Sequence, residues 1–288
     1  MRILITGVLG FIGQHLARSL SNSGHTVAGT FHTPRQAAQH ASYLTALYNM
    51  SLEEPQFGID FSQFDVIIHL ACDQRSGRSD TNYKGTVRLA EAAARNGITR
   101  QVFVSSYSAR ADAISEYGRT KYRLERYFRD GGYEIFRPGL VLGNGGTAAR
   151  IVRAVKISPI LPLPSGGWGE IPFISIAALC DAIRQILERP RDREHNLFSR
   201  HFTTLDQLVR TIRKVVCKGS GVVVVPIPAP LMLLGLQFAE ILRLPTPLNA
   251  DNLKGFLRNQ RRLHESALEE LGVKSETLLE AVEAANLQ

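Results

Sequence analysis

The sequence predicts an α/β protein with a doubly wound parallel sheet and a smaller C-terminal lobe. Over the first ~140 residues, short apolar strands alternate with helical patterns, which is typical of a parallel sheet covered on both faces. After Pro138, turn residues such as Gly143-Asn144-Gly145-Gly146 interrupt this alternation and leave isolated helices. We therefore expect one domain over residues 1–140 and a lobe over residues 141–288, of which about 171–200 returns to the first sheet.

Each expected element follows from a local pattern. Strands are expected where short apolar runs are bounded by turn residues, at residues 2–6, 26–31, 66–71, 101–105 and 133–137. A further strand near residues 43–48 has a weaker pattern. Helices are expected from Phe11 to Asn22-Ser23-Gly24, over residues 81–95 before Gly97, and around Tyr117 and Lys121.

The composition is that of a folded protein in a reducing compartment. The chain has 288 residues, of which 44% are hydrophobic, enough for one large domain with a smaller lobe. Cys72, Cys180 and Cys217 are far apart and lack metal-ligand spacing, so neither a disulfide framework nor a metal site is expected. An apolar run begins directly after Met1-Arg2 without the features of a secretory signal, so the cytoplasm is the expected location.

The net charge of +8 is compatible with several anionic partners. Basic residues are spread along the chain, with a denser cluster at residues 254–262, and they are not interleaved with aromatic residues, so no nucleic acid partner is expected. Residues 221–241 are apolar over nearly the length of a membrane span, but Pro226, Pro228 and Pro230 interrupt them. We expect a strand, a proline-rich turn and an amphipathic helix there, and no membrane span.

Three glycines follow the first strand at the spacing of a dinucleotide-binding turn. Gly7 allows the tight turn, Gly10 lets the backbone approach a pyrophosphate, and Gly13 permits close packing of the helix on the strand. The N–H groups and dipole at the start of that helix favour phosphates. The alternative is a plain strand-to-helix turn, but the position between a strand and an amphipathic helix favours a dinucleotide in a Rossmann-type sheet.

The end of the second strand bears on which dinucleotide binds. An acidic residue there would bind the ribose diol and indicate NAD, but residues 30–35 (TFHTPR) contain no carboxylate. His32 and Arg35 could instead contact a 2′-phosphate, which favours NADP as the cofactor. NAD is the alternative, in which case both side chains are solvated loop residues.

Further motifs occur in order along the chain: ITG through Gly13, VIIHLA at 66–71, Asn82 in DTNYKGT, FVSS ending at Ser106, YGRTK at 117–121, Arg137-Pro138-Gly139 and FISIAALCDAI at 173–183. Together they resemble the short-chain dehydrogenase/reductase superfamily, in particular its extended, NAD-dependent epimerase/dehydratase type. The resemblance covers most of the chain. It implies a substrate-binding C-terminal lobe and cofactor contacts from Gly7, Gly10, Phe11, Ile12, Gly13, Leu70, Ala71, Tyr117, Lys121 and Pro138.

Tyr117 and Lys121 are the candidate proton-transfer residues. They lie one helical turn apart, so the ammonium can sit near the phenol and the cofactor ribose. A phenol with an ordinary pKa of about 10 becomes a usable acid or base when a cation and the oxidised nicotinamide favour its phenolate. The alternative is a surface tyrosine beside a solvated lysine.

The resemblance assigns two further residues to the reaction. It implies that Ser106 hydrogen-bonds the substrate oxygen, with Ser105 and Ser108 near enough to take that role, and that Asn82 orients a helix or relays protons. The sequence thus predicts an NAD(P)-dependent oxidoreductase, epimerase or dehydratase acting at a carbinol or carbonyl carbon. Only ten residues separate Ser106 from Tyr117, fewer than in many nucleotide-sugar epimerases. The alternative function is a redox-silent dinucleotide-binding accessory or regulatory protein, similar to the accessory subunit of respiratory complex I.

The expected partner is a small-molecule substrate that is anionic or sugar-like. Arg75, Arg78 and the cluster at 254–262 could bind a diphosphate or a carboxylate, although a solvated face is the favoured interpretation. Trp168, in a glycine-rich loop, could stack on a sugar or base, or fill the core. The resemblance also allows a homodimer through two helices that often pair in this family, and the sequence leaves the oligomeric state open.

Overall fold

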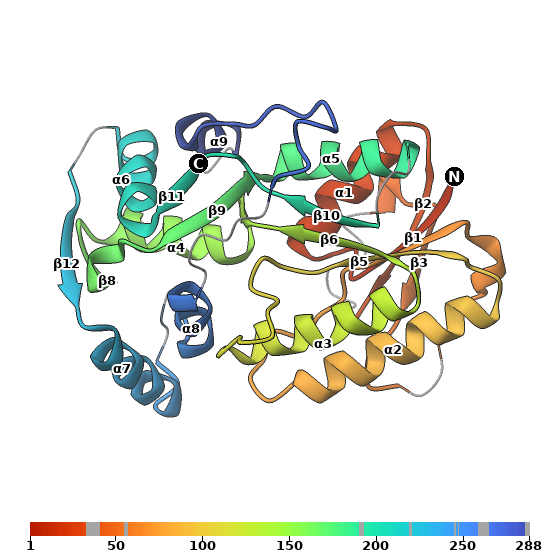
Figure 1. Ribbon diagram of the computed structural model, residues 1–288, viewed down its shortest axis with the longest axis horizontal. Helices are drawn as coiled ribbons and strands as arrows, with labels where there is room; N and C mark the ends of the chain where they lie inside the picture. The colour runs from red at the N-terminus through yellow and green to blue at the C-terminus, as the bar shows by residue number, and fades with distance from the viewer. Residues whose placement is uncertain are drawn as a thin grey trace. The chain divides into compact units, whose positions relative to one another are not determined.

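The computed structural model describes residues 1–32, 41–54, 57–189, 193–218, 221–244, 246, 248–258 and 265–285 (Figure 1). The chain forms two compact units. The first unit comprises Met1–Ala111, Arg119–Arg137 and Cys180–His195, and the second comprises Asp112–Gly118, Pro138–Leu179 and Asn196–Gln288. The assignment of a substrate-binding role to residues 141–288 stays a prediction.

The first unit is built on a seven-stranded sheet in the order β10-β6-β5-β4-β1-β2-β3. The strands are β1 (Arg2–Thr6), β2 (Thr26–Phe31), β3 (Ala46–Asn49), β4 (Val66–His69), β5 (Arg100–Val104), β6 (Glu134–Pro138) and β10 (Glu194–Leu197). All neighbours from β6 to β3 are parallel. The strand order reverses between β1 and β4, and ligands of open α/β sheets bind at the carboxyl ends of the strands at such a reversal.

Helices cover both faces of this sheet, as the sequence predicts. The helices α1 (Phe11–Asn22) and α5 (Ile176–Glu188) lie on one face, and α2 (Ser79–Arg95) and α3 (Glu116–Asp130) lie on the other (Figure 1). The buried side chains of Phe103 and Ile135, on β5 and β6, pack with Leu124 and Phe128 of α3. Short 3₁₀ turns form at Ala41–Tyr43 and Phe61–Gln63. The doubly wound α/β fold is therefore confirmed.

Two expected strands end differently from their sequence patterns. The weak strand pattern near residues 43–48 corresponds to β3, which lies at Ala46–Asn49 on the edge of the sheet. The apolar run over residues 66–71 leaves the sheet after His69. The reason is that the backbone N–H groups of Leu70 and Ala71 both donate to the side-chain oxygen of Thr6, at 3.0 Å, instead of to a strand.

The second unit contains a three-stranded sheet, β11-β9-β7, and a two-stranded sheet, β12-β8. The strands are β7 (Leu140–Leu142), β8 (Ile160–Pro164), β9 (Glu170–Ser175), β11 (Phe202–Thr204) and β12 (Val223–Ile227). The helices are α4 (Gly146–Ile157), α6 (Leu205–Val216), α7 (Ala229–Ile241), α8 (Ala250–Arg258) and α9 (Leu278–Ala284), with a 3₁₀ turn at Ser165–Gly167. Phe173, Leu208 and Ala281 are completely buried in the core between β9, α6 and α9.

One expectation for this unit is wrong, and one of two alternatives is excluded. The helix after Pro228 is not amphipathic, because Gln237 and Glu240 are its only polar residues, and none of its residues is buried. Trp168 does not fill the core, since 75% of the residue is exposed. Among the described residues, no helix is both long and apolar enough to cross a membrane.

Candidate functional site

The turn between β1 and α1 brings the backbone of three segments close together. Gly7 has a φ of 66°, and a Cβ added there would lie only 2.9 Å from the Ala71 Cα. A Cβ on Gly13 would lie 2.6 Å from the Gly7 carbonyl oxygen and 2.8 Å from the Val8 Cα. Both positions therefore require glycine, Gly7 for its conformation and its neighbour, and Gly13 for the closeness of α1 to the turn.

Two threonines that are not among the predicted site residues hold this turn in place. The Thr30 Oγ1 accepts the Gly7 N–H at 3.0 Å, and the Thr6 Oγ1 accepts the N–H groups of Leu70 and Ala71. Both threonines are 1% exposed. The sequence does indicate them weakly, because a threonine lies near the carboxyl end of each of the two adjacent buried strands β1 and β2. At such a position a side-chain oxygen can accept hydrogen bonds from a neighbouring loop.

The first turn of α1 suits a pyrophosphate. Gly10 is the N-cap residue, and within the described residues no side chain caps this helix and no acidic residue lies in its first turn. The N–H groups of Phe11 and Ile12 belong to the orphan donors of a helix N-terminus, where the dipole favours negative charge. These uncapped donors, at a turn that Gly7 and Gly13 make compact, fit the phosphates of a dinucleotide.

The other predicted cofactor residues are less closely grouped. His32 directly follows β2 and is exposed, whereas Arg35 lies outside the described residues. Leu70 and Ala71 are half-buried beside Gly7. Pro138 is a buried residue at the end of β6 and belongs to the second unit.

Lys121 is a buried cation at the carboxyl end of β5. Its Nζ donates to the Val104 carbonyl at 2.8 Å and lies 4.7 Å from the centre of the Phe103 ring. Burial lowers the pKa of Lys121, and the nearby Cys72 and Glu125 oppose that shift. Lys121 is thus not a solvated surface lysine, and its charge lies close to the strand end that leads to the serines.

The serines after β5 are placed in a tight loop. The Ser106 Oγ accepts the Ser108 N–H at 3.2 Å, and the Ser106 carbonyl accepts the Ala109 N–H at 3.0 Å. A hydroxyl that accepts in this way keeps its own O–H as a donor. Among the described residues, no hydrogen bond partner is found for the buried Ser105 Oγ. The loop thus contains two serine hydroxyl groups, those of Ser105 and Ser106, that can donate a hydrogen bond.

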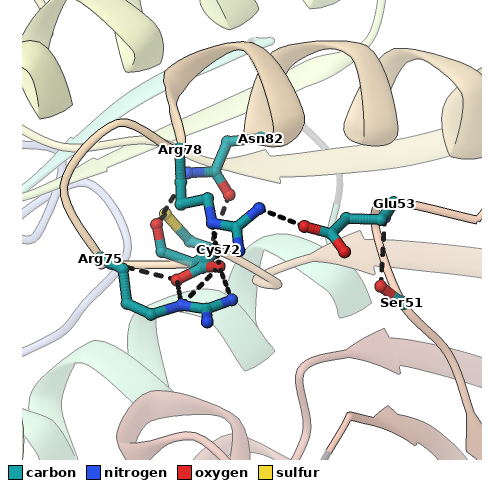
Figure 2. A network of polar contacts seen from close by, with 7 residues as sticks. Ser51, Glu53, Cys72, Arg75, Arg78 and Asn82 are labelled. Carbon is teal, nitrogen blue, oxygen red and sulfur yellow. Dashed lines mark hydrogen bonds and ion pairs between the residues drawn. The ribbon is translucent and has the colours of Figure 1, made fainter.

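A polar network fixes the loop after β4 (Figure 2). The Asn82 side chain accepts the Asp73 N–H and donates to the Asp73 carbonyl, both at 2.8 Å. Arg75 binds the Asp73 carboxylate at 2.6 Å, and Arg78 contacts both Asp73 and Glu53. The hydrogen bond from Arg75 lowers the pKa of Asp73. Both arginines thus bind carboxylates of the protein itself, and Asn82 holds the loop that follows Ala71.

Tyr117 lies in the first turn of α3, one turn before Lys121. The N-terminus of α3 is capped by a residue that is distant in the sequence. The Asp251 carboxylate accepts the N–H of Glu116 at 2.6 Å and the N–H of Tyr117 at 3.1 Å. Asp251 lies in the first turn of α8. A residue 134 positions away could not be assigned to this role from the sequence, since nothing in its local pattern indicates the partner.

Replacing this cap should move the tyrosine. We expect Asp251→Ala to destabilise the protein by about 1 kcal/mol, because it removes the acceptor of two helix N-terminal donors. If Tyr117 is the proton-transfer residue that the sequence predicts, turnover should fall while KM changes little, since Tyr117 lies in the uncapped turn. Thermal unfolding and steady-state kinetics test this. Asp251→Asn keeps only one of the two acceptor oxygens, so its losses should be intermediate, and unchanged turnover in Asp251→Ala would exclude a positioning role.

His69 is a buried neutral base at the end of β4. Its Nε2 lies 2.9 Å from the Gln101 Oε1, and since the Gln101 amide donates to the Ala90 carbonyl, the His69 Nε2–H is the donor. Burial lowers the pKa of His69 to about 4, against the opposing effect of the Gln101 hydrogen bond. The ring also packs against Phe128, with 5.0 Å between centroids.

Acid should therefore destabilise the protein partly through His69. An unfolded histidine binds its proton below a pH of about 6.5, whereas the folded one does so only near its lowered pKa of about 4. The unfolded state then holds more protons, so stability falls as pH falls through this window. We expect His69→Asn to lose less stability than the wild type between about pH 7 and about pH 5 in urea unfolding. An equal loss would contradict this, and His201→Asn, at an exposed site, is the control.

The match to known sequences covers the elements described above. Residues 3–198 match the model of the NAD dependent epimerase/dehydratase family. The chain is 24% identical over 260 residues to a UDP-glucose 4-epimerase of Vibrio cholerae, covering 78% of this chain and 79% of that protein. It is 26% identical over 243 residues to a UDP-glucose 4-epimerase of Pisum sativum, covering 71% of this chain and 65% of that protein.

Solved structures share the fold at lower identity. A UDP-glucose 4-epimerase from Thermotoga maritima, solved with UDP-glucose, aligns with a TM-score of 0.72 at 20% identity, covering 100% of this chain and 98% of that one. A UDP-glucose 4-epimerase from Bifidobacterium longum, solved with NAD+ and UDP, aligns with a TM-score of 0.69 at 16% identity and the same coverage. At these identities the likeness concerns the fold.

Proposed function

Because the chain belongs to the NAD-dependent epimerase/dehydratase family, we propose that it changes the sugar of a sugar nucleotide by a cycle of oxidation and reduction. It is an NAD(P)-dependent enzyme of the short-chain dehydrogenase type. The observation that carries the proposal is the glycine turn beside Ala71 in the same unit as the buried Lys121, whose helix carries Tyr117 in its first turn. The names of the relatives support a sugar nucleotide as the substrate.

Each residue has a defined task in the proposed reaction. A dinucleotide held at the glycine turn would accept a hydride from the sugar at its oxidised nicotinamide ring and return it in the second half of the cycle. We assign to the Tyr117 hydroxyl the exchange of the proton with the substrate oxygen, and to Lys121 the stabilisation of the tyrosine phenolate. The Ser106 hydroxyl donates a hydrogen bond to the same substrate oxygen. Asn82 acts as a positioning residue, since both polar atoms of its side-chain amide bind the Asp73 backbone.

We also propose which of the two dinucleotides, NAD or NADP, the protein prefers. We favour NADP because β2 ends without a carboxylate and His32 follows it as an exposed residue. A carboxylate at position 32 would bind a ribose diol and repel a 2′-phosphate. We expect His32→Asp to weaken NADP binding about tenfold or more and to strengthen NAD binding, measured by calorimetric titration. His201→Asp is the control for added charge, and an unchanged preference in His32→Asp would contradict the assignment.

A direct assay separates the proposed function from its alternative. The protein is incubated with UDP-glucose or UDP-galactose, and the sugars are analysed together with the redox state of the cofactor. Interconversion without net change of the cofactor indicates an epimerase, and loss of water from the sugar indicates a dehydratase. Tight dinucleotide binding without turnover on any sugar nucleotide would instead support the redox-silent accessory protein. Dimer formation and the location in the cell stay predictions.

A further inference from the structure

The second unit carries an apolar helix that the described residues of the chain do not cover. In α7, Leu231, Leu234, Phe238 and Ile241 are spaced by three, four and three residues, so they lie on one side of the helix. These side chains form the apolar face of α7, and they are 60%, 62%, 63% and 76% exposed. Helices that are apolar on all sides are normally buried, and none of the residues of α7 is buried. The apolar face therefore needs a partner.

The opposite side of this helix is already packed. Met232, Leu233 and Leu236 are half-buried, and α7 packs on α8 within the second unit. The Glu240 carboxylate also accepts the Ala250 N–H at 2.7 Å, which joins the end of α7 to the start of α8. The half-buried side of α7 thus packs within the second unit, and the apolar face of α7 is exposed.

The strand that leads into α7 continues the apolar surface. Figure 1 shows β12 running directly into α7. In the parallel pair of β12 and β8, Val223 lies opposite Ile160, and these residues are 60% and 54% exposed. The outer side of a sheet that faced water would carry polar residues, and this one carries valine, isoleucine and proline. Exposed apolar side chains thus occur on two successive elements, β12 and α7.

The charges at the two ends of this apolar surface indicate the nature of the partner. Residues 214–258 contain five lysines and arginines and two carboxylates, those of Glu240 and Asp251. Both carboxylates accept hydrogen bonds from helix N-termini. Lys214, Lys218 and Arg243 are exposed before and after the apolar segment. A second copy of this chain would bring like charges together, whereas an anionic surface would be attracted to them.

We propose that α7 docks the protein on an anionic lipid surface, with Leu231, Leu234, Phe238 and Ile241 inserted among the acyl chains and the basic residues at the two ends of the apolar segment near the headgroups. A helix of 13 residues is about 20 Å long, which is too short to span a bilayer but suits a helix that lies in its interface. Insertion of the apolar face supplies most of the affinity, and the basic residues add an attraction that salt weakens.

Sedimentation with vesicles tests the proposal on the full chain. We expect the wild type to bind vesicles made of equal parts of phosphatidylcholine and phosphatidylglycerol, to bind pure phosphatidylcholine vesicles more weakly, and to lose affinity as salt is raised. The double variant Leu234→Glu/Phe238→Glu should bind at least about tenfold more weakly, since each buried side chain contributes about a factor of ten or more. Both positions are exposed, so the thermal midpoint should not change.

A matched control and a second readout complete the test. Leu279→Glu makes the same change at a leucine of α9 that is 42% exposed, and it should bind like the wild type. Phe238→Trp in a Trp168→Phe background should show a blue shift of its fluorescence with the mixed vesicles. The proposal is overturned if the wild type stays in the supernatant with both vesicle types or if the double variant binds equally well. A dimer in gel filtration that the double variant dissociates would assign the apolar face to a second copy instead.

Discussion

Tyr117→Phe should lower turnover on a sugar nucleotide by about two to four orders of magnitude, because it removes the only atom that we assign to proton exchange. The first turn of α3 should be preserved, since the cap from Asp251 is made to the backbone N–H of residue 117 and not to its side chain. Dinucleotide affinity should fall less than turnover, because the phenyl ring of residue 117 is kept and the glycine turn is unaltered. Steady-state kinetics with calorimetric titration of the cofactor measure both effects.

The control for this variant is on the same helix. Tyr122→Phe removes a hydroxyl from α3 one residue beyond Lys121, and it should keep turnover within a small factor of the wild type. If Tyr117→Phe retained full turnover, the acid/base assignment would be wrong. If both variants lost turnover equally, the loss would come from damage to α3.

Gly13→Ala should destabilise the protein and weaken dinucleotide binding. Inside a helix, alanine is normally favoured over glycine by about 1 kcal/mol. Here the added Cβ would meet the Gly7 carbonyl oxygen and the Val8 backbone at 2.6 to 2.8 Å, and backbone atoms cannot move aside as a flexible side chain can. Overpacking of this kind costs about 1–3 kcal/mol, so the net effect should be a loss of stability.

The same displacement should misplace the N–H donors of the turn. One hydrogen bond to a charged group is worth about 1.5–3 kcal/mol, so dinucleotide affinity should fall about tenfold to a hundredfold. Thermal unfolding and calorimetric titration measure the two effects separately. Gly58→Ala is the control, because an added Cβ at Gly58 would meet nothing within 4 Å. Unchanged affinity in Gly13→Ala would mean that the dinucleotide does not bind at this turn.

The sequence predicted the parts of the fold that depend on local pattern. Short apolar runs and helical spacing identified most of the parallel sheet, and Gly7, Gly10 and Gly13 identified the turn before α1, because these signals lie within a few residues of one another. The end of β4 was predicted two residues late. Leu70 and Ala71 have the apolar pattern of a strand, but the Thr6 hydroxyl takes their N–H groups.

Contacts between distant segments could not be predicted. The cap that Asp251 makes on α3 joins residues 134 and 135 positions apart, and the network of Asp73 assigns Arg75 and Arg78 to partners within the protein. The apolar character of α7 was visible in the sequence, but its exposure was not. Apolar residues usually indicate burial, and the amphipathic interpretation followed from that assumption.

Calorimetric titration of nucleotide-free protein with NAD and with NADP decides whether a dinucleotide binds across the glycine turn. We predict saturable binding of at least one of the two by the wild type, unchanged by Gly58→Ala and weakened about tenfold to a hundredfold by Gly13→Ala. Absence of binding of both nucleotides to the folded wild type, or equal binding by Gly13→Ala, would contradict the account.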